Sequence, residues 1–132
     1  MESVNFNSVS LAIPEECFAG CTSLSSVTGT SAITSIGKNA FRGCAALSTI
    51  SLPSTLTSID EYAFYKCTGF TALTIPSSVI EIGSSAFDYC TGTQIITLGW
   101  NTSDSTERDI ADDAFGYAGV IVKYNDGSNY GN

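Results

Sequence analysis

The sequence predicts an α/β repeat solenoid of about five coils that follow one another with a period of 23 in the sequence. The first observation behind this prediction is a Phe-x-x-Cys motif, which begins at Phe18, Phe41, Phe64 and Phe87 with that constant spacing. The second is that every unit mixes two hydrophobic periods, one typical of a strand and one typical of a helical turn. A single unit could not bury its own apolar face, so we expect the units to stack.

The strand segment of each unit alternates apolar and polar residues, as a strand buried on one face does. Its copies are Val27-Thr28-Gly29, Ile50-Ser51-Leu52, Leu73-Thr74-Ile75 and Ile96-Thr97-Leu98. The other segment spaces its apolar residues by three, as in Ala40-Phe41-x-x-Cys44-x-x-Leu47, and this spacing predicts one or two turns of helix. We therefore expect stacked coils with parallel strands and continuous apolar ladders inside.

The repeat register predicts a single domain over residues 1–132. The spacing to a fifth copy, at Phe115, is 28 instead of 23, which indicates a short insertion before it. The repeats are expected at about 8–30, 31–53, 54–76, 77–99 and 105–124, with the insertion at about 99–107. In the last copy Ala118 replaces Cys, and a strand-like segment is followed by the turn signal Asn125-Asp126-Gly127. These features predict a C-terminal cap over about 115–132.

This pattern resembles the BspA-like, or treponemal-type, leucine-rich repeats. The resemblance is carried by residues 33–52, 53–75 and 76–98. Departures occur at Gly29 and Thr30, where the family has Leu-Pro, at Thr93, where it has Leu, and at Ala118, where it has Cys. It implies a right-handed leucine-rich-repeat solenoid with a parallel sheet on the concave side. It also implies a surface protein that mediates adhesion or recognition.

The five cysteines favour a core ladder over a metal site or a disulfide framework. Cys21, Cys44, Cys67 and Cys90 share one repeat position, and free Cys is a small, frequently buried apolar residue. The chain contains no His, which weakens a zinc interpretation. We expect the four to be reduced and shielded from solvent. Cys17 lies four positions before Cys21, a spacing that leaves a bridge between them open.

Composition excludes several function classes. The chain carries 13 acidic and 5 basic residues, for a net charge of −8, and the cations are scattered, so neither nucleic acid nor an anionic membrane is an expected partner. No apolar run is long enough to insert into a bilayer, and no signal peptide is recognisable at the N-terminus. The low content of charged residues, 14%, a surface rich in hydroxyl groups and a start inside a repeat favour a fragment of an extracellular or cell-surface protein.

Catalysis and cofactor binding are not expected. Without His, a Ser or Cys nucleophile lacks its usual base. Five carboxylates cluster around the insertion, at Asp104, Glu107, Asp109, Asp112 and Asp113. Their spacing does not follow the calcium-binding order of an EF-hand, and a solvated acidic loop is the favoured interpretation. We expect no cofactor and no metal.

Two surfaces are candidates for binding a protein partner. The first is the polar side of the strands, with Thr28, Ser51, Thr74 and Thr97 at equivalent positions and Thr49 beside them, which predicts a flat array of hydroxyl groups. The second is aromatic: Tyr65, Tyr89, Tyr117 and Trp100. The hypothesis is a non-enzymatic protein-binding or adhesion module. Its alternatives are a structural spacer or cap of a longer repeat array, and a glycan- or ice-binding Thr face.

Overall fold

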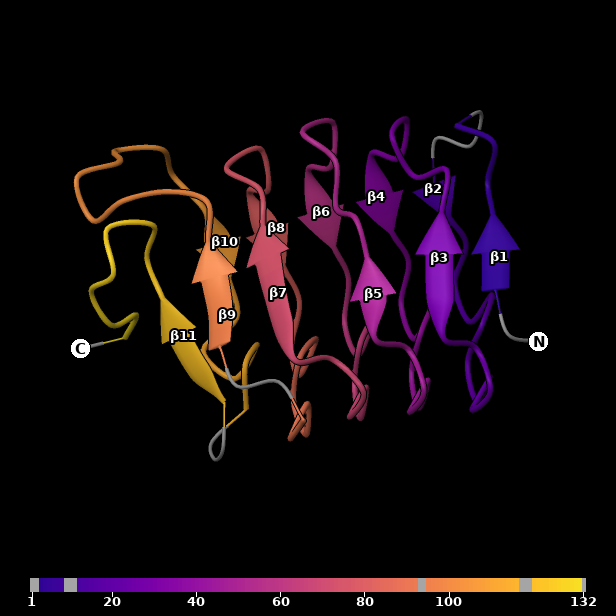
Figure 1. Ribbon diagram of the computed structural model, residues 1–132. Coiled ribbons are helices and arrows are strands. Elements are labelled where there is room, and N and C mark those ends of the chain that lie inside the picture. The colour runs from indigo at the N-terminus through magenta and orange to yellow at the C-terminus, as the bar shows by residue number, and fades with distance from the viewer. Residues whose placement is uncertain (1–2, 9–11, 93–94, 117–119, 132) are drawn as a thin grey trace.

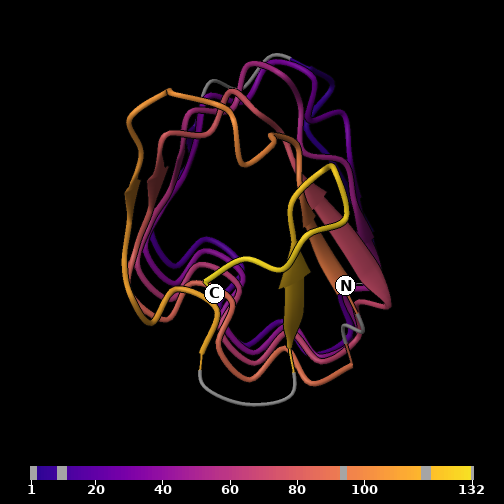
Figure 2. The same cartoon turned by 90° about the vertical axis from the view of Figure 1, so that its left-hand side faces the viewer.

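The computed structural model describes residues 3–8, 12–92, 95–116 and 120–131, which wind into a parallel β-solenoid (Figure 1). Its strands form two rows that lie on different sides of the coil, as the view along the axis shows (Figure 2). The front row contains β1 (Ser3–Asn5), β3 (Ser26–Thr28), β5 (Thr49–Ile50), β7 (Ala72–Ile75), β9 (Ile95–Leu98) and β11 (Ile121–Lys123). The back row contains β2 (Ala12–Ile13), β4 (Ser35–Ile36), β6 (Ser58–Ile59), β8 (Glu81–Ile82) and β10 (Asp109–Ile110).

The register of the strands confirms the predicted solenoid of about five coils. In the back row Ile36 lies beside Ile13 and Ile59, its equivalents in the preceding and following repeats. In the front row Leu73 lies beside Ile96, again at the same place in the next repeat. All of these strand pairs are parallel, as the stacking argument predicts. The back row was not predicted as strand, because each of its members contributes only two residues to the ladder.

The expected helical turns do not form, and the described residues contain no helix. The segment after β4 is instead a series of tight turns in which Asn39 and Gly43 adopt left-handed φ values of 58° and 75°. A left-handed residue ends a right-handed helix, because the chain can no longer bond to the carbonyl four residues back. The amides turn outward: Phe41 N–H donates to Ala63 O of the next coil at 2.8 Å. The spacing by three therefore reflects consecutive turns and not a helix.

The core is a stack of equivalent side chains. Four successive ring pairs join Phe18, Phe41, Phe64, Phe87 and Phe115, all stacked, with centroids 5.2 to 5.7 Å apart. These rings lie on the turn side of each coil, beside the back row. Together with the aliphatic residues of both rows they form one continuous core.

The cysteine ladder is buried in three of its four members. Cys44, Cys67 and Cys90 are buried, and their Sγ atoms donate to carbonyls of the preceding coil at 3.0 to 3.1 Å. Burial raises the pKa of Cys44 to about 11 and that of Cys90 to about 12. Cys21 differs from the expectation: it is only half-buried, because it belongs to the first coil, which is covered from one side. Cys17 and Cys21 are both free thiols.

The chain after β11 crosses the end of the last coil, as Figure 2 shows in yellow. Lys123 forms an antiparallel bridge with Asn129, and Tyr130 N–H donates to Val122 O at 3.0 Å. The Tyr130 ring packs edge-on against Phe115 with the centroids 5.5 Å apart. This arrangement is compatible with the predicted C-terminal cap. No helix with the length and apolar character to cross a membrane occurs among the described residues.

Candidate functional site

The exposed side chains of the front row differ between its two halves. In the N-terminal half, β3 and β5 present Ser26 and Thr49 at equivalent positions. In the C-terminal half the same row continues as Ala72, Ile95 and Ile121, which lie in register on β7, β9 and β11. Ile95 is 38% exposed and Ile121 is 52% exposed. The front face therefore changes from hydroxyl-bearing to aliphatic along the axis.

The predicted array of hydroxyl groups is interrupted in the middle. Thr74 and Thr97 lie side by side on paired strands. However, β5 pairs only with β3 and β7 only with β9, so the front row consists of two three-stranded sheets. No Cα atom of β5 lies within 8 Å of a Cα atom of β7, whereas paired strands lie about 4.8 Å apart. Figure 1 shows the wider space between these two strands. Ser51 and Thr74 thus belong to separate patches and not to one flat surface.

A groove of about 390 Å³ lies between β5 and β7. Its lining comes from residues 48–52 and 71–76: Ser48, Thr49, Ile50, Ser51, Leu52, Thr71, Ala72, Leu73, Thr74 and Pro76. None of these described lining residues is charged, although the chain carries a net charge of −8. Ile50 and Leu52 are only half-buried, while their equivalents Leu73 and Ile75 are buried. The groove therefore has an apolar floor and hydroxyl groups at its rim.

The groove coincides with a change in the core. Phe70 occupies the repeat position of Leu24 and Leu47, and it is 1% exposed. Leu24 and Leu47 each close a tight turn, with their N–H groups donating to Cys21 O and Cys44 O at 3.1 Å, but Phe70 makes no such bond to Cys67 O. Its ring packs against Phe64 with the centroids 5.9 Å apart. We attribute the separation of β5 from β7 to this larger side chain, since interiors are too densely packed to absorb it.

The second predicted surface is partly present. Tyr65 and Tyr89 lie edge to face with their centroids 5.5 Å apart, and Tyr89 is 53% exposed. Two of the few cations of the chain sit on these rings: Arg42 lies over Tyr65 at 5.1 Å, and Lys66 lies over Tyr89 at 5.8 Å. The result is a compact aromatic and cationic surface on the turn side. Tyr117 lies outside the described residues.

Trp100 is not part of an exposed aromatic surface, contrary to expectation. Its side chain is 6% exposed and joins the core cluster. The cause is the insertion, which folds back so that the Arg108 guanidinium lies over the Trp100 ring at 4.1 Å. Sequence reasoning missed Arg108 as the organising residue, because nothing in the repeat pattern marks it.

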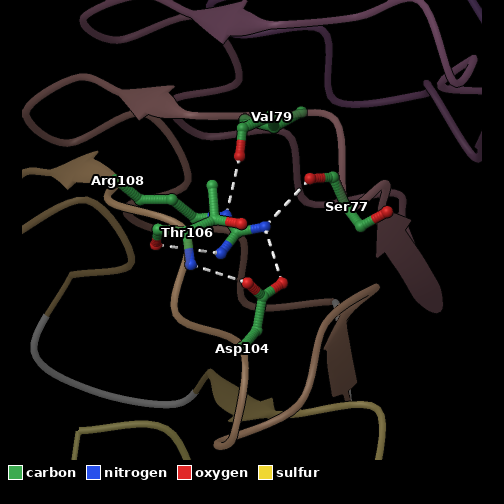
Figure 3. A network of polar contacts seen from close by, with 5 residues as sticks. All are labelled: Ser77, Val79, Asp104, Thr106 and Arg108. Carbon is green, nitrogen blue, oxygen red and sulfur yellow. Dashed lines mark hydrogen bonds and ion pairs between the residues drawn. The ribbon is translucent and has the colours of Figure 1, made fainter.

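Arg108 joins the insertion to the fourth coil (Figure 3). Its Nε donates to Val79 O at 3.0 Å and its Nη2 donates to Ser77 O at 2.9 Å. Nη2 also contacts Asp104 Oδ2 at 3.1 Å. Hydrogen bonds from Thr106, and then from Arg108, lower the pKa of Asp104 to about 2. The acidic loop is therefore ordered by contacts within the chain, and no group of three His, Cys, Asp or Glu residues in the described ranges could hold a metal ion.

A second hollow, of about 470 Å³, lies over the back row and includes Asp60, Glu81 and Asp109 in its lining. Unlike the front groove, it covers a sheet in which β2, β4, β6, β8 and β10 are all paired in sequence. Its backbone groups therefore already have partners. The front groove differs because it combines free strand edges with an uncharged lining.

The regular coil, with its parallel strands and stacked Phe and Cys ladders, defines the class of leucine-rich-repeat solenoids. The family model described as "BspA type Leucine rich repeat region" matches residues 1–122 in six copies, and the chain belongs to this family. No curated protein matches the chain.

Solved structures show the same fold. A leucine-rich cell surface protein of Faecalibacterium prausnitzii A2-165 superposes with a TM-score of 0.79 at 28% identity, covering 93% of this chain and 32% of that protein. A leucine-rich repeat protein of Bacteroides ovatus gives 0.72 at 26% identity, covering 94% and 30%. The pneumococcal vaccine antigen PcpA, at 22% identity and a TM-score of 0.73, shares the fold over 95% of this chain and 31% of its own. The chain thus spans about one third of the length of these proteins.

Proposed function

We propose that the chain is a non-enzymatic protein-binding or adhesion module of a cell-surface or secreted protein, and that its front row of strands is the recognition face. The observation that carries this proposal is the aliphatic row Ala72, Ile95 and Ile121, exposed beside Thr74 and Thr97. Exposed apolar side chains in register favour contact with a partner that removes them from water. Membership of the family and the cell-surface description of the Faecalibacterium protein support the proposed location.

A catalytic role has no support in the chemistry of the chain. It contains no His, and the buried thiols of Cys44 and Cys90 have a pKa raised by burial, which keeps them protonated and unreactive. The interruption between β5 and β7 also argues against an ice-binding array, since only short stretches of the hydroxyl row are flat.

The test compares the two candidate surfaces with a partner isolated by pull-down from the natural surroundings of the source. Replacing Ser51 and Thr74 with Arg adds bulk and charge to the front face, while both positions are exposed, so the melting temperature should change little. Binding should fall by tenfold or more, about 1.4 kcal/mol. The matched variant replaces Tyr65 and Tyr89 with Ala on the turn side. If the tyrosine variant loses affinity and the arginine variant retains it, recognition does not use the front row.

A further inference from the structure

We propose that the groove between β5 and β7 receives an extended peptide segment of the partner, which pairs with both strands and joins the two front sheets into one. This inference rests on the proposed function and specifies how the front row recognises a protein. It follows from the free edges of the two strands, the width between them and the chemistry of the lining.

Each strand offers an unpaired edge to the groove. On the side of β3, Ser51 O accepts from Thr30 Oγ1, and on the side of β9, Ile75 O accepts from Gly99 N–H. Successive residues of a strand direct their backbone groups to opposite sides. The alternation therefore places the N–H and C=O groups of Ile50, Ala72 and Thr74 toward the groove. An unpaired strand edge is a template for another strand.

The separation of the strands and their free backbone groups favour one occupant. The Cα atoms of β5 and β7 are more than 8 Å apart, and one inserted strand requires two spacings of about 4.8 Å, or about 9.6 Å in all. A helix with side chains has a diameter of about 10 Å or more and presents no free backbone groups, so it could not satisfy either edge. Direct pairing of β5 with β7 is prevented by the same separation. A single extended chain needs a separation greater than 8 Å and is the occupant that satisfies the hydrogen-bonding groups of both edges.

The lining selects the side chains of the occupant. Side chains of a strand alternate between faces, so every second residue of the inserted segment would face the apolar floor formed by Ile50 and Leu52. Small β-branched residues suit that side. The remaining residues would face outward beside Ser51 and Thr74, where hydroxyl groups are compatible. Charged residues on the inner side would lose hydration without finding an opposite charge. The partner segment is therefore an uncharged, extended stretch with alternating β-branched and hydroxyl-bearing residues.

The experiment uses the intact chain and the synthetic peptide acetyl-Ser-Val-Thr-Val-Thr-Val-Ser-amide as the probe. Amide hydrogen exchange is followed by NMR with and without peptide. At ten times the dissociation constant, mass action slows exchange of paired amides by about tenfold. The amides of Ile50, Ala72 and Thr74 should be protected to this extent. Protection confined to the outer edge of β1 or of β2, or no protection at millimolar peptide, would overturn the inference.

Two N-methylated peptides provide the decisive control. One carries N-methyl groups on its odd residues and the other on its even residues, so each loses the donors on one edge only. Insertion uses both edges, and both peptides should bind at least tenfold more weakly than the parent. Loss with only one of them means addition to a single edge and contradicts insertion.

A pair of variants at equivalent repeat positions tests whether the peptide binds in the groove. Ser51→Trp fills the groove and should weaken peptide binding at least tenfold, while Thr28→Trp, between paired strands β1 and β3, should not. Equal effects of the two variants would contradict the groove. If the peptide does not bind while the variant with Arg at Ser51 and Thr74 still loses the natural partner, strand insertion is wrong and the proposal of the recognition face stands. If the arginine variant keeps the partner, the recognition face itself is wrong.

Discussion

The front and back rows pass through the same coils, but only the back row is continuous. Between the second and third coils, β4 pairs with β6 in the back, while β5 and β7 remain apart in the front. The turn side is also closed there, since Phe41 N–H donates to Ala63 O at 2.8 Å and Cys67 Sγ donates to Phe41 O at 3.0 Å. The stacking of the coils therefore depends on the back row and the turns. This leaves the front row free to open at one place without separating the coils.

The largest effect on stability should come from the core beside the back row and the turns, where the coils are bonded to one another. Phe64 is fully buried and stacks on Phe41 and Phe87, so Phe64→Ala should lower the free energy of unfolding by about 3–5 kcal/mol in urea denaturation. Leu52→Ala, at the half-buried floor of the groove, should cost less than half as much, since less apolar surface is lost. Equal losses would show that the two sides contribute alike to the stack.

The position of the opening should follow the large side chain. Phe70→Leu restores the residue found at Leu24 and Leu47, and we expect β5 and β7 to pair, with amide exchange in residues 72–75 slowed by about tenfold or more. The reverse variant, Leu47→Phe, should separate β3 from β5 and cost about 1–3 kcal/mol through overpacking. Unchanged exchange in Phe70→Leu would assign the opening to another cause.

The thiol ladder of the closed side should make the protein sensitive to alkaline pH. Burial raises the pKa of Cys44 from 9.0 to about 11 and that of Cys90 from 9.0 to about 12, so the folded state favours the protonated thiols. Their contribution to stability is complete below pH 9.0 and is lost as the pH rises toward 11 and 12. Denaturation measured across this range should show a steeper loss in the native chain than in a Cys44→Ala, Cys90→Ala variant. Parallel curves would exclude the thiols as the cause.

The smallest effect should come from the ion pair that joins the second and third coils. Lys38 Nζ lies 3.6 Å from Glu61 Oε2, and both side chains are at least 40% exposed. Lys38→Met should change the free energy of unfolding by less than about 0.5 kcal/mol, with little dependence on salt, because exposed pairs are screened by solvent. A larger loss, abolished by salt, would mean that charge contributes to closing this side.

Much of the fold could be predicted because stacking repeats one environment in every coil. The recurrence of Phe41, Phe64 and Phe87 at a spacing of 23 identifies buried positions that local propensity alone would not distinguish. The prediction of helical turns was wrong, because spacing by three is shared by helices and by consecutive turns. Left-handed Asn39 and Gly43 decide between them, and φ cannot be read from apolar spacing.

The candidate site could be predicted only in outline. The strand positions of Thr28, Ser51, Thr74 and Thr97 follow from the register, but we attribute the space between β5 and β7 to the packing of one side chain, Phe70. The departure of Phe70 from Leu was visible in the sequence, and its consequence was not, because a core can accommodate a larger residue in several ways. Trp100 was misplaced for a related reason: its ring is covered by Arg108, which lies in the insertion outside the repeat.

The open front between β5 and β7 gives the solenoid a soft section in the mechanical sense. Elsewhere in the described coils, bending toward or away from the front must compress or stretch backbone hydrogen bonds in both rows. At this one place the front carries no such bonds, and the paired back strands β4 and β6 act as a hinge line. A load along the axis is therefore concentrated there, and it changes the width of the groove before it changes any other spacing. A strand bound across the groove would act as a brace that stiffens the rod.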